Sequence, residues 1–201
     1  MSLVILTRLL AVAAMVAIWH WSQGLIGKRG LNSQGIGDKI HDWMTPLHRF
    51  LESSPLAVRL LLISSSLGID LLGLAVLYHG IFGPTVGPIV GLALLLALRQ
   101  SAQYLTALPP PPGMIWRDPG VPSLFVTYGV ANDLFFSGHT ALAVFGALTV
   151  ASMGIPQLGW VALAVGLYEV FTVLALRAHW TMDVYAGAVT ALLCFWIGQS
   201  F

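Results

Sequence analysis

Six apolar stretches, each about as long as a membrane-spanning helix, constrain the fold of this chain more than any other feature. A helix needs roughly 20 predominantly apolar residues to cross the hydrocarbon core of a bilayer. The stretches cover residues 4–22, 56–79, 84–104, 134–153, 157–177 and 179–199. Only 8% of the residues are charged, against about 25% in soluble domains. We therefore predict an all-α, multi-pass integral membrane protein whose six transmembrane helices form a single domain, residues 1–201.

The segment between the first two spans predicts a further helix of a different kind. Over about residues 38–53 the apolar side chains recur at helical spacing, and charged or imidazole side chains fill the other face. Such an amphipathic helix typically lies in the plane of the membrane interface. We expect an interfacial helix here, kinked at Pro46, with the role of a structural collar.

Several classes of function are disfavoured by composition. The formal net charge is +1 and there is no basic block, so we expect no nucleic-acid partner. The single cysteine, Cys194, excludes an intrachain disulfide, and no Cys/His cluster has the spacing of a metal site. The sequence leaves the oligomeric state open.

Ionisable side chains gather at one end of the predicted spans. With a rise of about 1.5 Å per residue, most of the spans and the loop after the third bring such groups to one layer, whereas the loops around 80–83 and 153–156 carry no charge. Ionisable groups inside a membrane are costly and mark functional sites. Some of these residues could instead have purely structural roles: Arg59 could extend its charged end to the membrane interface, and Glu169 could make a packing hydrogen bond. The layer contains Arg59, Arg99, Arg117, Asp133, His139, Glu169, Arg177, His179 and Asp183.

Three residues of this layer have the chemistry of phosphoryl transfer. His179 and Asp183 are four residues apart, which places them on one helix face. A carboxylate bonded to one imidazole nitrogen fixes the tautomer and leaves the other nitrogen as a nucleophile. His139 follows Ser137 and Gly138 at a predicted helix start, where it can act as general acid and base.

The remaining candidates would bind the substrate. Ser137 and Gly138 allow phosphate oxygens to approach free backbone N–H groups at the helix start. Arginines hold phosphate by forked hydrogen bonds, and these would supply the charge stabilisation that a metal ion provides elsewhere, so we expect no cofactor. Glu169 could neutralise an arginine or accept a proton from an acceptor alcohol, and Asp133 could orient His139 or bind a cationic headgroup. The candidate arginines are Arg99, Arg177 and Arg59.

The motifs "SGHT" (137–140) and "HWTMD" (179–183) resemble the type 2 phosphatidic acid phosphatase superfamily. Within it, the stretch "LRQSAQYLTALPPPPGM" (98–114) and the aromatic Trp180 after the histidine look like the sphingomyelin synthase branch. The resemblance implies a metal-independent enzyme with His179 as nucleophile, Asp183 as its orienter and His139 as acid/base. It also implies an active site that faces away from the cytoplasm, whereas the basic residues between the first two spans favour the opposite side.

The chain departs from the superfamily's phosphatase pattern in three places. Phe136 replaces a proline before the S-G-H motif, a K-x-x-x-x-x-x-R-P motif is absent, and Arg177 lies only two residues before His179. The leading hypothesis is a lipid headgroup phosphotransferase with membrane lipids as donor and acceptor, the acceptor being ceramide or diacylglycerol. The alternatives are a lipid phosphatase or phospholipase C-like hydrolase that uses water, and a non-catalytic lipid-binding protein.

Overall fold

The protein is all-α over the residues that its computed structural model describes, which are 3–28, 37–128 and 134–201. These residues contain seven helices and no strand. The helices are α1 (Leu3–Ile26), α2 (Lys39–Glu52), α3 (Pro55–Phe82), α4 (Gly87–Leu105), α5 (Gly138–Ser152), α6 (Pro156–Ala175) and α7 (Thr181–Gly198).

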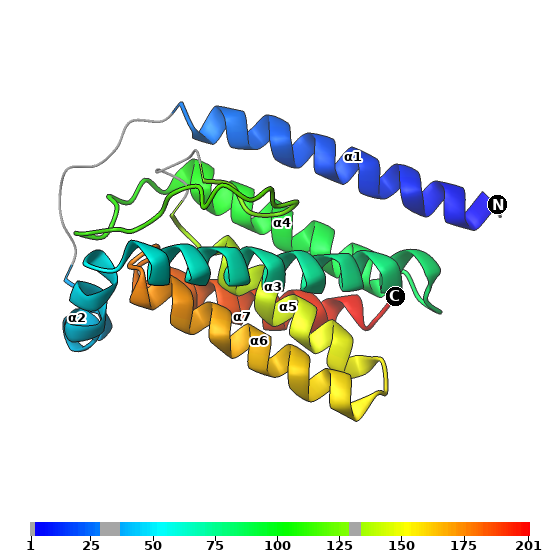
Figure 1. Ribbon diagram of the computed structural model, residues 1–201. Coiled ribbons are helices and arrows are strands. Elements are labelled where there is room, and N and C mark those ends of the chain that lie inside the picture. The colour runs from blue at the N-terminus through cyan, green and yellow to red at the C-terminus, as the bar shows by residue number, and fades with distance from the viewer. Residues whose placement is uncertain (1–2, 29–36, 129–133) are drawn as a thin grey trace.

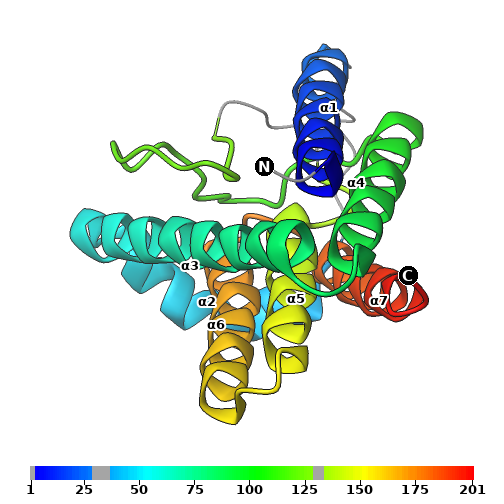
Figure 2. The ribbon, with the colours of Figure 1, turned by 90° about the vertical axis from the view of Figure 1, so that its right-hand side faces the viewer.

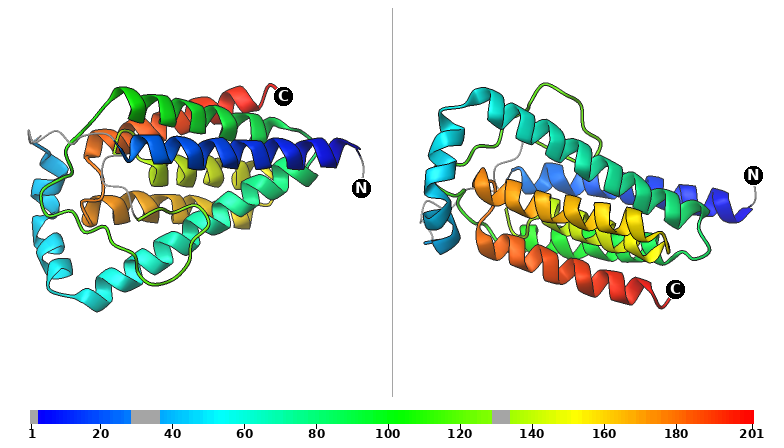
Figure 3. Two further views of the ribbon diagram at one scale, coloured as in Figure 1. Left: turned by 90° about the horizontal axis from the view of Figure 1, so that it is seen from above. Right: turned by 60° about the horizontal axis from the view of Figure 1, so that its bottom comes forward.

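Six of these helices run side by side, and α2 lies across one end of the bundle (Figures 1 and 3). Both chain termini are at the opposite end (Figure 1). The loop from α4 towards α5 leaves at the α2 end and runs back along α3 (Figure 1). The turn between α6 and α7 also lies at the α2 end, so α2, this loop and this turn meet there.

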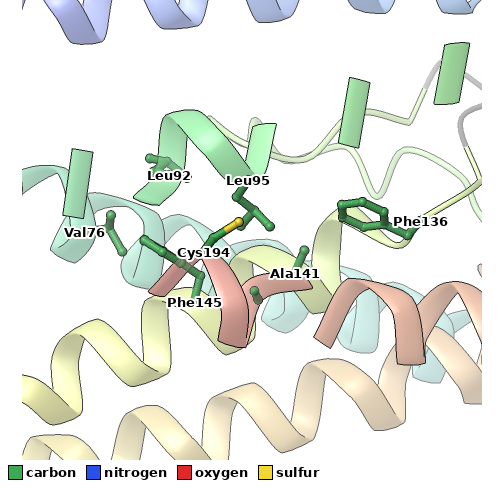
Figure 4. Packing of buried hydrophobic residues seen from close by; sticks show 8 residues of the cluster. Val76, Leu92, Leu95, Phe136, Ala141, Phe145 and Cys194 are labelled. Carbon is green, nitrogen blue, oxygen red and sulfur yellow. The ribbon is translucent and has the colours of Figure 1, made fainter. Parts of the chain in front are cut away.

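Helix α5 occupies the centre of the bundle (Figure 2). It packs against α3, α4, α6 and α7. Much of the core lies where four helices meet: Val76 of α3, Leu95 of α4, Phe145 of α5 and Cys194 of α7 are all buried in one cluster (Figure 4). Glycines allow this close packing, because a Cβ at Gly91 would lie 2.9 Å from the Cys194 carbonyl oxygen.

The predicted spans agree with the observed helices to within a few residues at most ends. Pro55, Pro88 and Pro156 each lie in the first turn of a helix, where a missing N–H is tolerated. The fourth span is shorter than predicted and starts at Gly138, because the Ser137 side chain caps it by accepting a hydrogen bond from the Thr140 N–H. Helix α2 continues through Pro46.

Among the described residues, four helices are long and apolar enough to cross a membrane: α1, α3, α6 and α7. Helix α5 has only 15 residues, and α4 contains Arg99, Gln100 and Gln103 in its last turns, so neither belongs to this group. The number of spans and the interfacial location of α2 remain predictions. The apolar helices identify the chain as a membrane protein, in which α1 is least covered by the rest of the fold.

Candidate active site

A cavity within the bundle has a small polar end on the α2 side and an otherwise mostly apolar wall. Its polar end carries Arg99, His139 and His179, and the backbone of Gly138 lies beside them. No carboxylate is among the described residues that line it. The apolar wall comes from α1, α3, α4, α5 and the loop before α5, through side chains such as Met15, Trp19, Ile69, Leu77, Leu92, Leu96, Phe125 and Leu142. The geometry therefore suits an anionic group attached to an apolar chain.

His179 lies two residues before α7 and is only 7% exposed. Its Nδ1 donates a hydrogen bond to the Leu134 carbonyl oxygen at 3.0 Å. A carbonyl can only accept, so Nδ1 carries a proton, and in the tautomer that this bond selects the lone pair is on Nε2. The tautomer is thereby the one that the nucleophile hypothesis requires.

The group that fixes this tautomer is the Leu134 carbonyl, whereas the sequence predicted the Asp183 carboxylate. Asp183 Oδ2 is 3.8 Å from His179 Nδ1, beyond hydrogen-bond distance, and accepts instead from the Trp180 N–H at 3.0 Å. Asp183 is fully buried and closes the capping box of α7. Its carboxylate therefore orders the chain beside His179 and faces any positive charge that develops on the ring, while the Leu134 carbonyl orients the ring.

His139 lies in the first turn of α5, at the positive end of the helix dipole. Its ring makes a T-shaped contact with the Trp116 ring, with centroids 4.8 Å apart, and its buried Nε2 has no hydrogen-bond partner among the described residues. Gly138 allows Arg99 to approach, because a Cβ at position 138 would lie 2.5 Å from Arg99 Nε. Arg99 itself is only 8% exposed. The structure thus joins a cation and an unpaired imidazole nitrogen in one cavity with His179.

The two histidine motifs converge because α5 and α7 touch at their starts. The Ser137 N–H donates to the Asp183 carbonyl oxygen at 3.0 Å. One turn further along α7, a Cβ at Gly187 would lie 2.6 Å from the Ser137 carbonyl oxygen. This close approach fixes the first turn of α5 against that of α7.

Four of the predicted binding residues that the structure describes lie outside the cavity lining: Arg177, Arg59, Glu169 and Ser137, whose side chain caps α5 instead. Arg177 has φ 52°, and its guanidinium donates to Pro112 and His41 carbonyl oxygens and to Thr45 Oγ1, so it holds α2 and not a phosphate. Arg59 is exposed and donates to the Pro119 carbonyl oxygen.

Glu169 is fully buried between α6 and α3, where its Oε2 accepts from Ser65 Oγ at 2.6 Å. This contact therefore supports the packing role that the sequence left open for Glu169. Asp133 lies outside the described residues.

Sequence reasoning missed the contribution of α2. Its N-cap Asp38 and its polar residues His41, Thr45 and His48 are spaced by three, four and three positions, which places them on one side of the helix. This face contacts the α6–α7 turn: His41 and His48 are buried there, whereas Trp43 is 73% exposed. The 3-4-3 spacing of polar residues was the available signal.

Burial and hydrogen bonds set the charges at this contact. Burial lowers the pKa of His41, and the nearby Asp38 carboxylate offsets this only in part, so the ring is neutral near pH 7. Burial acts to raise the pKa of Asp38, but hydrogen bonds from Thr181 and the His41 N–H outweigh it and leave this pKa below its usual value. Asp38 is therefore a carboxylate under ordinary conditions.

Residues 130–200 match the family model described as PAP2 superfamily C-terminal. This match confirms, for that part of the chain, the resemblance to the type 2 phosphatidic acid phosphatase superfamily, and it covers His139, His179 and Asp183. It does not address the sphingomyelin synthase branch. No curated protein and no solved structure matched the chain. Membership of this superfamily is associated with lipid phosphatase or phosphotransferase activity.

Proposed function

We propose that this protein is a lipid headgroup phosphotransferase that moves a phospho-headgroup from a phospholipid to a lipid alcohol through a phosphohistidine at His179. The observation that carries the proposal is the composition of the cavity. Two imidazoles and an arginine meet at its polar end, and the rest of the wall is almost entirely apolar. An anionic phosphodiester fits the first part, and acyl chains fit the second.

The reaction has two balanced steps. In the first, Nε2 of His179 attacks phosphorus, the bond to the glycerol oxygen breaks, and the departing diacylglycerol takes a proton from His139. In the second, the acceptor hydroxyl gives its proton to His139 and attacks phosphorus, and the bond to Nε2 breaks. Asp183, 3.8 Å from Nδ1, stabilises the positive charge of the phosphohistidine. Arg99 holds the phosphate oxygens.

A lipid alcohol is favoured over water as acceptor by the surroundings of the histidines. Trp116, Leu134, Ala141 and Leu142 line the cavity close to His139 in sequence or space. These side chains offer no hydrogen bond to position an attacking water, except for the Trp116 indole N–H, which already donates to the Thr127 carbonyl oxygen. Ceramide or diacylglycerol would bring its hydroxyl on an apolar body that the wall accommodates.

The proposal includes a multi-pass topology. Helices α1 and α3 to α7 run side by side (Figure 1), and four of them have the length and hydropathy of a span. Helices α4 and α5 pack among these four, so we propose that they cross the bilayer as covered spans. Helix α2, with Trp43 and Phe50 exposed, would then lie in the interface.

The test uses purified protein in mixed micelles with a phospholipid labelled at the headgroup phosphate. With ceramide or diacylglycerol added, we expect a new labelled phospholipid, and acid-labile label on the protein when the acceptor is omitted. His179→Ala should abolish both signals, and His139→Ala should slow each by about 10²- to 10⁴-fold. Release of a water-soluble phosphoester instead of a new phospholipid would show a hydrolase. Full activity in His179→Ala would refute the phosphohistidine.

A further inference from the structure

Helix α2 binds the main chain of the turn that carries His179. The His41 Nε2–H donates to the His179 carbonyl oxygen at 3.0 Å, in a buried contact. The Asp38 carboxylate accepts from the Thr181 N–H at 2.6 Å and from Thr181 Oγ1 at 2.8 Å. The His41 ring also stacks on Trp180, with centroids 5.8 Å apart. Three consecutive residues, 179 to 181, are therefore held from the α2 side.

The same turn is held from the bundle side by different groups. The His179 ring bonds to Leu134, the Trp180 N–H to Asp183, and the Trp180 indole to the Pro109 carbonyl oxygen at 2.7 Å. The side chain of the nucleophile thus faces the cavity while its carbonyl faces α2. Fixing both ends leaves the ring little freedom to swing or translate.

Asp38 connects the start of α2 to the start of α7. Its Oδ1 caps α2 through the Ile40 and His41 N–H groups, and the same carboxylate receives both Thr181 donors at the first residue of α7. Its side chain is 6% exposed and that of His41 is 5% exposed. Water therefore cannot readily replace either contact, and each lost bond leaves a buried polar group unsatisfied.

We propose that His41 and Asp38 are positioning residues for the nucleophile, and that α2 sets the place of His179 Nε2 in the cavity. Neither side chain lines the cavity, so neither touches the reacting atoms. They act through the main chain of residues 179–181. The inference rests on the proposed function for its catalytic meaning, whereas the placement of the turn is independent of it.

The experiment compares two buried histidines of α2 that each donate to a carbonyl of this region. His41→Leu removes the bond to His179, and His41→Gln keeps a donor near the Nε2 position. His48 is the matched control: it is 2% exposed, and its Nδ1 donates to the Ala175 carbonyl oxygen at 2.9 Å, at the end of α6. His48→Leu therefore removes an equivalent bond that does not reach the nucleophile.

A displacement of about 1 Å can cost on the order of 10²-fold in rate, so we expect His41→Leu to lower kcat by about 10- to 100-fold. KM should change by less than about threefold, since binding groups are untouched. His41→Gln should recover most of kcat, and His48→Leu should retain it even if its thermal stability falls as far. Equal losses of kcat in His41→Leu and His48→Leu would show a merely structural role.

A readout that needs no activity accompanies the kinetics. Amide hydrogen exchange of peptides covering residues 179–182 should rise by at least about tenfold in His41→Leu and Asp38→Asn, and stay near wild type in His48→Leu. Unchanged exchange in both of the first two variants would overturn the proposal whatever the enzyme does. An inactive wild type with the expected exchange pattern would refute the proposed function and leave the positioning of the turn intact.

Discussion

Substitution of Gly138 by alanine should lower the enzymatic activity and leave the stability of the fold almost unchanged. A Cβ at residue 138 would lie 2.5 Å from Arg99 Nε and 2.8 Å from Arg99 Cζ, whereas unstrained heavy atoms are about 3.5 Å apart. The guanidinium therefore has to retreat by roughly 1 Å. Alanine is also a better helix former than glycine, by about 1 kcal/mol, so the first turn of α5 should lose little stability.

The expected loss follows from the hydrogen bond that Arg99 would make to the substrate phosphate under the proposed function. A hydrogen bond to a charged group is worth about 1.5–3 kcal/mol, which corresponds to roughly 10- to 150-fold in kcat/KM. The assay is transfer of labelled headgroup phosphate to an acceptor lipid, with thermal unfolding measured on the same preparation. We expect Gly138→Ala to lose activity by this factor while its Tm stays within about 2 °C of wild type.

A double-mutant cycle shows whether Arg99 transmits the effect. Arg99→Ala removes the guanidinium, so adding Gly138→Ala to it should cost little more, and the two changes should be strongly non-additive. Additive losses would mean that the methyl group acts on another part of the cavity. Wild-type activity in Gly138→Ala would refute the reasoning, because it would show that the guanidinium need not occupy its present position.

Three further outcomes follow from other contacts. Asp70→Asn should destabilise by about 1–3 kcal/mol and raise hydrogen exchange near residue 124, since the Asp70 carboxylate accepts from Ser123 Oγ and from two backbone N–H groups of the loop. Gly187→Ala should cost about 1–3 kcal/mol in chemical unfolding through its clash with α5, whereas Gly24→Ala, with open space around it, should cost nothing. Because the folded-state pKa of His41 is lowered from 6.5, stability should fall as pH drops below about 6.5, and His41→Gln should flatten that part of the pH profile.

The depth of a residue along a helix could be predicted from the sequence, whereas its direction around the helix could not. Counting residues placed Arg99, His139 and His179 at one level, and the structure brings all three to one cavity. The same counting placed Glu169 at that level, but its side chain points towards Ser65 on α3. Direction depends on which neighbours a helix packs against, and apolar spans give little sign of this, because their residues are apolar on every side.

The α6–α7 turn shows a second limit. Arg177 is two residues from His179 in sequence, yet its left-handed backbone turns its side chain to α2. Left-handed φ values are rare for residues other than glycine, so an extended or helical turn was the natural expectation. The contacts of the polar face of α2 were not predicted for a related reason. Polar residues of an interfacial helix are usually expected to face water, and only the 3-4-3 spacing distinguishes Asp38, His41, Thr45 and His48 from such residues.

The cavity is lined by residues from two parts of the chain, the part that matches the superfamily and the helices before it. The histidines and Asp183 lie within residues 130–200, the part that matches the superfamily, and their geometry depends on contacts between α5, α7 and the turn before α7. Much of the apolar wall, including Met15, Leu77 and Leu96, comes from earlier helices. Apolar side chains make no hydrogen bond to the histidines, so changes there can reshape the apolar part of the cavity without displacing His139 or His179. Under the proposed function, the selection of acyl chains can therefore vary through the apolar residues of α1, α3 and α4, while His139 on α5, His179 in the turn before α7 and Arg99 on α4 stay in place.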